Sequence, residues 1–84
     1  HIERELMMIK LKTNDDKEGD IKTVLYDYSA TIVNDKDQLL IIEVMADTAK
    51  NDKLLEALSA MSTLVAVART GPLALAKGDL KINL

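Results

Sequence analysis

Cysteine is absent from the 84 residues of the chain. No disulfide framework, cysteine metal site or thiolate nucleophile is therefore available. Histidine occurs once, as His1 at the start of the chain, where few contacts hold a side chain in place. The serines Ser29, Ser59 and Ser62 consequently have no histidine base to activate them. The sequence predicts no catalytic residue, no metal site and no bound cofactor.

Phenylalanine and tryptophan are also absent, and the only aromatic side chains are those of Tyr26 and Tyr28. The core must therefore be built from aliphatic residues and methionine. A domain of this size buries only about 60 to 65% of the surface that its unfolded chain exposes, so its stability should be small. Association with a second copy or with another protein would add to that stability, and we expect a homo-oligomer.

Neither the charge nor the hydropathy indicates nucleic acid or membrane as a partner. The formal net charge is -3, and the sequence has no basic cluster or aromatic stacking platform. No apolar run approaches the roughly 18 residues that a membrane span needs, and no signal-peptide pattern opens the chain. Because a chain without cysteine also suits a reducing compartment, we expect a cytoplasmic protein.

Two segments repeat their apolar residues with the period of an amphipathic helix. Asp15 and Glu18 form a capping-box pattern at the start of the first helix. A cap for the second helix is expected at Thr48 or Asn51. The apolar positions of the first helix are Ile21, Val24, Leu25 and Tyr28. Those of the second helix are Leu54, Ala57, Leu58 and Met61.

The remaining apolar segments predict strands. Side chains alternate from residue 3 to residue 12, which is typical of a strand with two distinct faces. Residues 30–33 and 39–46 are rich in β-forming side chains, and the polar segment 34–38 between them has the length of a hairpin connection. Residues 64–69 complete the set of strands.

The resulting order, βαββαβ, predicts an α+β fold of the ferredoxin-like type, a sandwich in which two helices cover one face of an antiparallel sheet. The first and third strands should lie side by side at its centre. Pro72 cannot donate to a strand ladder, so residues 73–77 can form only a short extension. We expect one domain over residues 1–78, followed by a C-terminal tail at residues 79–84.

The face of this sheet away from the helices should be polar, but the third strand is apolar on both sides. One stripe consists of Leu40, Ile42, Val44 and Ala46. The other consists of Leu39, Ile41 and Met45, with Glu43 between them, and Leu6, Met8, Ile32, Ala66 and Ala68 are expected to extend it. Either helix ends or the C-terminal tail cover this second stripe, or it is a protein interface.

The polar residues suggest structural roles more than chemistry. Asp35 and Asp37 lack the glycine and glutamate that follow in a calcium loop, so they are expected to be solvated turn residues. Of the strand carboxylates Glu3, Glu5 and Glu43, the last should form an ion pair with Arg4 or Lys10. Arg69, Thr70 and Gly71 end the last strand, where the arginine either fixes a carbonyl or carboxylate group or caps its own sheet edge.

Several segments together resemble the C-terminal domain of acetolactate synthase small subunits. These are ERELMMIK at residues 3–10, ATIV at 30–33, IEV at 42–44, KLLEAL at 53–58, and VARTG followed by LALAKG at 67–71 and 73–78. The resemblance implies a noncatalytic regulatory subunit that activates the thiamine-diphosphate-dependent catalytic subunit in branched-chain amino-acid biosynthesis. It also implies a preceding ACT domain that would hold the valine effector site, and pairing of the present domain through its sheet.

The main hypothesis is thus an interaction module that oligomerises and binds the catalytic subunit. Its predicted interface comprises Leu6, Met8, Leu39, Ile41, Glu43 and Met45, with a secondary contact at Arg69, Thr70 and Gly71. An alternative is a free-standing ACT-like domain that senses an amino acid at a dimer interface, although the charged segment 13–19 would hold such a ligand poorly. A third possibility is an active site that several chains share.

Overall fold

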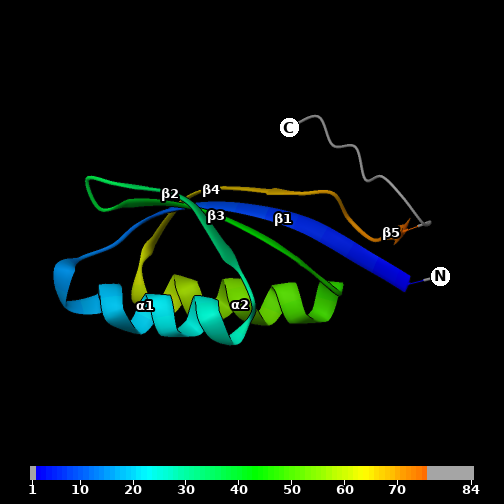
Figure 1. The fold of residues 1–84 in the computed structure, drawn as a ribbon, viewed down its shortest axis with the longest axis horizontal. Helices are drawn as coiled ribbons and strands as arrows, with labels where there is room; N and C mark the ends of the chain where they lie inside the picture. The colour runs from blue at the N-terminus through cyan, green and yellow to red at the C-terminus, as the bar shows by residue number, and fades with distance from the viewer. Residues whose placement is uncertain (1, 76–84) are drawn as a thin grey trace.

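The computed structural model of the chain describes residues 2–75. The element order is β1 (Ile2–Lys12), α1 (Asp15–Asp27), β2 (Thr31–Lys36), β3 (Leu39–Ala46), α2 (Thr48–Met61), β4 (Thr63–Arg69) and β5 (Leu73–Leu75). The strands form one antiparallel sheet in the order β2-β3-β1-β4, and β5 pairs with β1 next to the end of β4. Both helices lie on the same side of this sheet (Figure 1). The ferredoxin-like order and the central position of β1 and β3 are confirmed.

Strand register decides which side chains face the helices. Met7 lies opposite Val44, Ile9 opposite Ile42 and Leu11 opposite Leu40, and all of these side chains are buried. Because directly opposed residues of an antiparallel pair share a face, the residues between them point to the other side. The sheet therefore has one helix-covered face and one open face.

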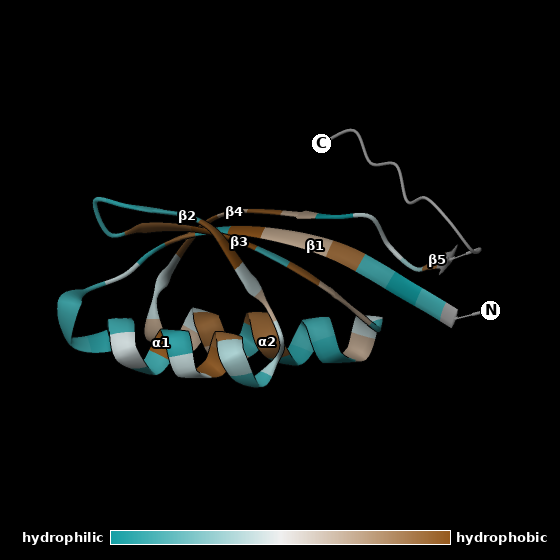
Figure 2. Ribbon diagram, in the orientation of Figure 1, coloured by the Kyte–Doolittle hydropathy of each residue, from teal (hydrophilic) through white to brown (hydrophobic). Residues whose placement is uncertain are grey.

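The core lies between the helix-covered face and the two helices. α1 contributes Ile21 and Leu25, and α2 contributes Leu54 and Leu58. The outer surfaces of both helices are hydrophilic, whereas the strands facing them are largely hydrophobic (Figure 2). Ile32 also packs against this core, because it lies opposite Ile42 in the β2–β3 register. Its expected position on the open face was wrong, since the bulge after it changes the alternation of β2.

The helix starts differ from those that the sequence predicts. Asp15 is the first residue of α1, the cap residue is Asn14, and no side chain caps this end, so the expected capping box is wrong. The cap of α2 is Asp47, whose Oδ1 accepts a hydrogen bond from the Lys50 amide at 2.7 Å. The expected cap at Thr48 or Asn51 was one to four positions too late.

The β2–β3 hairpin is tighter than expected. β2 continues through Lys36, so only Asp37 and Gln38 remain as the connection, in place of the polar segment 34–38. Both residues have positive φ angles, 54° and 64°, which is the conformation of a two-residue hairpin turn that follows the twist of its strands. β5 ends at Leu75, and the expected domain limit at residue 78 and the tail at 79–84 lie outside the described residues. Within the described part of the chain, no helix could cross a membrane.

Candidate interaction surface

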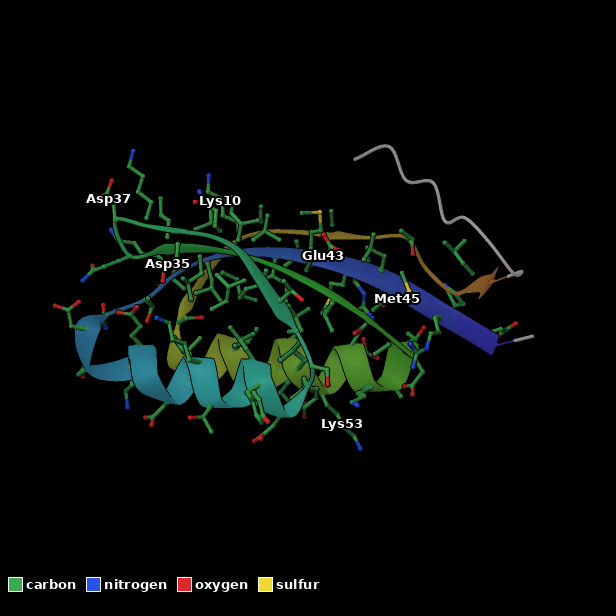
Figure 3. The ribbon with its side chains drawn as sticks, viewed as in Figure 1. Lys10, Asp35, Asp37, Glu43, Met45 and Lys53 are labelled. Carbon is green, nitrogen blue, oxygen red and sulfur yellow. The ribbon has the colours of Figure 1, made fainter. Side chains whose placement is uncertain are left out.

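The open face collects the apolar residues that the sequence predicts for it. Leu6 lies opposite Met45, Met8 opposite Glu43, Lys10 opposite Ile41, and Lys12 opposite Leu39. The predicted apolar interface residues, Leu6, Met8, Leu39, Ile41 and Met45, are all half-buried, whereas Glu43 is exposed. Lys10 and Glu43 point away from the helices (Figure 3). The structure therefore brings the six predicted residues of this stripe together on two adjacent strands.

A shallow hollow interrupts this face between β1 and β4. Its volume is about 210 Å³, and the residues around it include Met8, Ile41, Ala66 and Ala68. Ala66 lies opposite Lys10 and Ala68 opposite Met8 in the β1–β4 register. Because the two alanines are much shorter than the side chains of the neighbouring strand, the surface drops towards β4. The expected extension of the apolar stripe onto β4 is confirmed for both alanines.

The charge of the open face is mainly positive. Besides the acidic Glu43, this face carries Arg4, Lys10 and Lys12 on β1. It also carries Lys36 on β2, which lies opposite Leu39 of β3. Among the described residues the ion pairs involve Glu18, Lys22 and Asp35 on one side of the molecule and Glu5, Asp52 and Arg69 on the other. Glu43 takes part in none of these pairs, so its expected ion pair with Arg4 or Lys10 does not form within this chain.

Arg69 is used inside the fold. Its Nη2 atom lies 2.7 Å from Oε1 of Glu5 and 2.7 Å from Oδ1 of Asp52, and its Nε donates to the same Glu5 oxygen at 3.0 Å. These contacts connect the end of β4 to β1 and to α2. The arginine thus binds carboxylates of its own chain at the end of its own strand.

The side chain of Glu5 is only 3% exposed. This burial by itself raises the pKa of the carboxyl group. The hydrogen bonds from Arg69 and Asn51 and the positive charge of Arg69 lower the pKa, and together they outweigh the burial, so the pKa lies below its ordinary value of 4.5. The same hydrogen bond to Glu5, together with that to Asp52, raises the pKa of Arg69. Glu5 therefore remains ionised at neutral pH although it lies beside the core.

Asn51 completes this buried polar cluster. Its side chain is fully buried, and its Nδ2 donates to the carbonyl oxygen of Glu5 at 3.1 Å and to Oε1 of Glu5 at 3.0 Å. The sequence did not predict the burial of Asn51 or that of Glu5. The signal was present in both cases, because Glu5 alternates in phase with Met7 and Ile9, and Asn51 precedes Leu54 by three positions on the buried side of α2.

Thr70 continues the contacts of β4 with β1, and Gly71 follows it. The Leu6 amide donates to Oγ1 of Thr70, and the Thr70 amide donates to the carbonyl of Leu6, both at 3.1 Å. Gly71 has a φ of 75°, in the left-handed region, where glycine meets no steric penalty. Both residues are half-buried, so part of each remains accessible next to Leu6.

The two aspartates of the hairpin lie in different places. Asp35 belongs to β2, so its expected position in the turn was wrong, and its Oδ2 lies 3.4 Å from Nζ of Lys22. Asp37 occupies the hairpin turn and is exposed, as expected. Within residues 2–75 no three His, Cys, Asp or Glu side chains lie together in a way that could hold a metal ion.

The fold and this surface define a class of protein, a small ferredoxin-like domain with an apolar open sheet face. The chain also matches, over residues 4–78, the family model described as the small subunit of acetolactate synthase, and it belongs to that family.

Known relatives agree with this assignment. The chain is 27% identical over 78 residues to the acetolactate synthase small subunit of Buchnera aphidicola, covering 93% of this chain and 49% of that protein. It is 37% identical over 75 residues to the chloroplastic acetolactate synthase small subunit 2 of Arabidopsis thaliana, covering 89% of this chain and 16% of that protein. The chain therefore spans about half the length of the bacterial relative and a smaller part of the plant relative.

A solved structure shows the same fold. The crystal structure of the acetolactate synthase small subunit from Thermotoga maritima matches with a TM-score of 0.78 and 24% sequence identity. The match covers 94% of this chain and 48% of that chain.

Proposed function

We propose that this chain is a noncatalytic regulatory domain that supports oligomerisation and activation of the thiamine-diphosphate-dependent catalytic subunit of acetolactate synthase, in branched-chain amino-acid biosynthesis. The observation that carries the proposal is the apolar stripe on the open sheet face, made of Leu6, Met8, Leu39, Ile41 and Met45. The membership of the small-subunit family supports it and indicates which catalytic protein to test.

The physical reason for docking is the unburied area of this stripe. Burying an aliphatic or methionine side chain completely contributes about 1.5 to 3 kcal/mol, so covering the exposed part of each half-buried residue contributes about 1 kcal/mol. A contiguous apolar patch with a polar rim is typical of protein interfaces. Here the rim includes Lys10, Lys12 and Lys36.

The secondary contact at Arg69, Thr70 and Gly71 remains part of the proposal. Thr70 and Gly71 lie at the end of β4 beside Leu6, and so border the stripe. The guanidinium of Arg69 is held by Glu5 and Asp52, so a partner would meet mainly Thr70 and Gly71 at this position.

The substitution Ile41→Asp tests the proposal. A carboxylate at the centre of the stripe would have to be desolvated on docking. We therefore expect the concentration of the regulatory chain that gives half-maximal activation of the catalytic subunit to rise at least about tenfold. Acetolactate formation at increasing concentrations of the regulatory chain measures this effect, and light scattering measures self-association. Calorimetry with valine, leucine and isoleucine tests the alternative of an amino-acid sensor, which micromolar binding would favour.

The matched control is Val33→Asp. Val33 is 54% exposed at the bulge of β2 and lies outside the stripe, so the same chemical change should leave activation and self-association close to those of the parent chain. Circular dichroism establishes that both variants are folded. If folded Ile41→Asp activates and associates like Val33→Asp, the open face is not the interface.

A further inference from the structure

The corner of the open face next to the β2–β3 hairpin combines lysines with apolar side chains. In the strand register Leu39 lies between Lys12 of β1 and Lys36 of β2. Ile41, two residues further along β3, lies opposite Lys10 of β1. The three lysines are exposed, and the two apolar side chains are half-buried. We call these five residues the basic corner.

The basic corner surrounds a hollow of about 220 Å³. The residues that line it are Lys10, Asn34, Lys36, Asp37, Leu39 and Ile41. Because the apolar residues are half-buried and the lysines are exposed, the hollow has an apolar floor and a charged rim. Lys10 points away from the helices, and Asp37 lies at the end of the hairpin (Figure 3). An apolar side chain of a partner can therefore enter the hollow between basic groups.

The lysines of the basic corner are not neutralised by their own domain. Between residues 2 and 75 none of the ion pairs includes one of them, although Lys22 on the helix side binds both Glu18 and Asp35. Adjacent strands are about 4.8 Å apart, so the backbones at Lys12 and Lys36, on either side of β3, are about 10 Å apart. This distance is about one Debye length at 0.1 M salt, so the positive charges repel each other. A carboxylate brought to the corner would relieve this repulsion.

The positive charge of the basic corner is local, since the whole chain has a net charge of -3. Two carboxylates lie in its surroundings. Asp37 borders the hollow from the exposed hairpin turn, and Glu43 lies beyond Ile41 on β3. Neither takes part in an ion pair within residues 2–75, and the three lysines outnumber them. The corner therefore attracts negative charge although the chain as a whole is negative.

A second copy of the chain matches this corner poorly. On the strands of the same face, a copy offers one carboxylate among the described residues, that of Glu43, against Arg4 and the three lysines. Contact between copies here would mainly oppose positive charges, which is unfavourable. The restriction concerns this corner alone and does not apply to the other end of the stripe, at Leu6 and Met45.

Nucleic acid and lipid also match the corner less well than protein does. Tyr26 belongs to α1 and Tyr28 to its C-cap, so the tyrosines lie in the helix layer and the open face has no aromatic side chain on which bases could stack. Basic clusters that bind anionic lipid have about four to eight lysines or arginines, and this corner has three lysines. A protein segment that carries both acidic and apolar side chains fits the rim and the floor together.

We propose that the basic corner binds an acidic segment of the catalytic subunit. An apolar side chain of that segment enters the hollow over Leu39 and Ile41, and flanking carboxylates lie against Lys10 and Lys36. The inference rests on the proposed function and adds the chemistry of the partner's surface. Because these ion pairs lie at an exposed rim, they act mainly on the rate and the salt dependence of association.

The test is Lys10→Glu/Lys36→Glu, with binding to the catalytic subunit measured by biolayer interferometry. The reversed charges would repel the acidic segment, and we expect the dissociation constant at about 0.05 M salt to rise at least about tenfold. At about 0.5 M salt the difference should shrink to within about threefold, because exposed charges are screened. Lys10→Gln/Lys36→Gln should give a smaller loss with the same salt dependence.

The matched control is Lys17→Glu/Lys53→Glu. It changes the net charge by the same amount at two exposed lysines of the helices, and Lys53 points away from the sheet (Figure 3). We expect its dissociation constant to stay within about threefold of the parent value at both salt concentrations. Circular dichroism establishes that all variants are folded.

Comparison with Ile41→Asp separates this inference from the proposed function. If Ile41→Asp weakens binding and Lys10→Glu/Lys36→Glu behaves like the helix control, the open face is the interface but its partner is not acidic. If neither variant weakens binding, or the parent chain does not bind, both proposals are wrong. Light scattering should show little change in self-association for the lysine variant, and a change as large as that in binding would assign the corner to a second copy. Lysine-dependent binding to a single-stranded oligonucleotide or to phosphatidylserine vesicles, without an effect on the catalytic subunit, would also overturn the inference.

Discussion

Glu5 shows how a single residue connects three elements. Its carboxylate accepts hydrogen bonds from Arg69 on β4 and from Asn51 on α2, while its own backbone belongs to β1. Removing one partner of a buried ion pair is more costly than the pair is stabilising, because the remaining charge stays desolvated. The ion pair of Lys22 with Glu18 is much more exposed and should matter far less.

We expect Arg69→Met to lower the free energy of unfolding by about 2 kcal/mol at neutral pH, less than for a fully buried pair because the Arg69 side chain is 26% exposed. Urea unfolding measures the loss, and Lys22→Met is the control that should leave the midpoint nearly unchanged. A similar loss for both variants would show that the buried carboxylate does not need Arg69.

The pH dependence of stability follows from the direction of the Glu5 shift. The pKa of Glu5 is lower in the folded than in the unfolded chain, so the unfolded chain binds the proton more readily. The stabilisation from this group is complete above the ordinary pKa of 4.5 and is lost as the pH falls below it. The difference in stability between the parent chain and Arg69→Met should therefore shrink between about pH 5 and pH 3, and a constant difference would contradict this explanation.

The two helices begin in different ways, although both are preceded by a residue that is favoured as a cap. The Asp47 side chain caps α2 with a 2.7 Å hydrogen bond, whereas the Asn14 side chain makes no cap hydrogen bond to α1. Residue type alone does not distinguish them, since asparagine and aspartate have similar cap preferences. The difference depends on how the chain enters each helix from the sheet.

A matched pair of substitutions tests this difference. We expect Asp47→Ala to lower the free energy of unfolding by about 1 kcal/mol and Asn14→Ala to lower it by about half as much or less. Thermal unfolding with constant protein concentration measures both. Equal losses would mean that Asn14 contributes a capping interaction in solution as well.

The secondary structure was largely predictable because its periods are local. Alternation in β1 and the apolar spacing in the two helices placed every element to within a few residues. The hairpin turn was not predictable in this way. Asp37 and Gln38 adopt a conformation that usually selects asparagine and glycine, so residue type gave no signal of a two-residue turn.

The whole molecule combines a thin core with an exposed edge and an exposed apolar face. Folded chains that associate gain stability by mass action, since only the folded state binds a second copy. We expect the midpoint of thermal unfolding to rise with protein concentration for the parent chain and for Val33→Asp. The midpoint of Ile41→Asp should depend much less on concentration, and a steep dependence in that variant would show that another surface dominates self-association.

The sequence by itself determined the α+β class, the element order and the five residues of the apolar stripe, because each follows from periods of two or 3.6 residues within one segment. Tertiary structure alone decided that Ile32 joins the core, that Arg69 binds Glu5 and Asp52, and that Glu43 forms no ion pair with another residue of the segment 2–75. These outcomes depend on the register between strands that are distant in sequence and on the position of a helix end beside them. The packing of the whole domain sets this register and this position, and no pattern within a single segment predicts them.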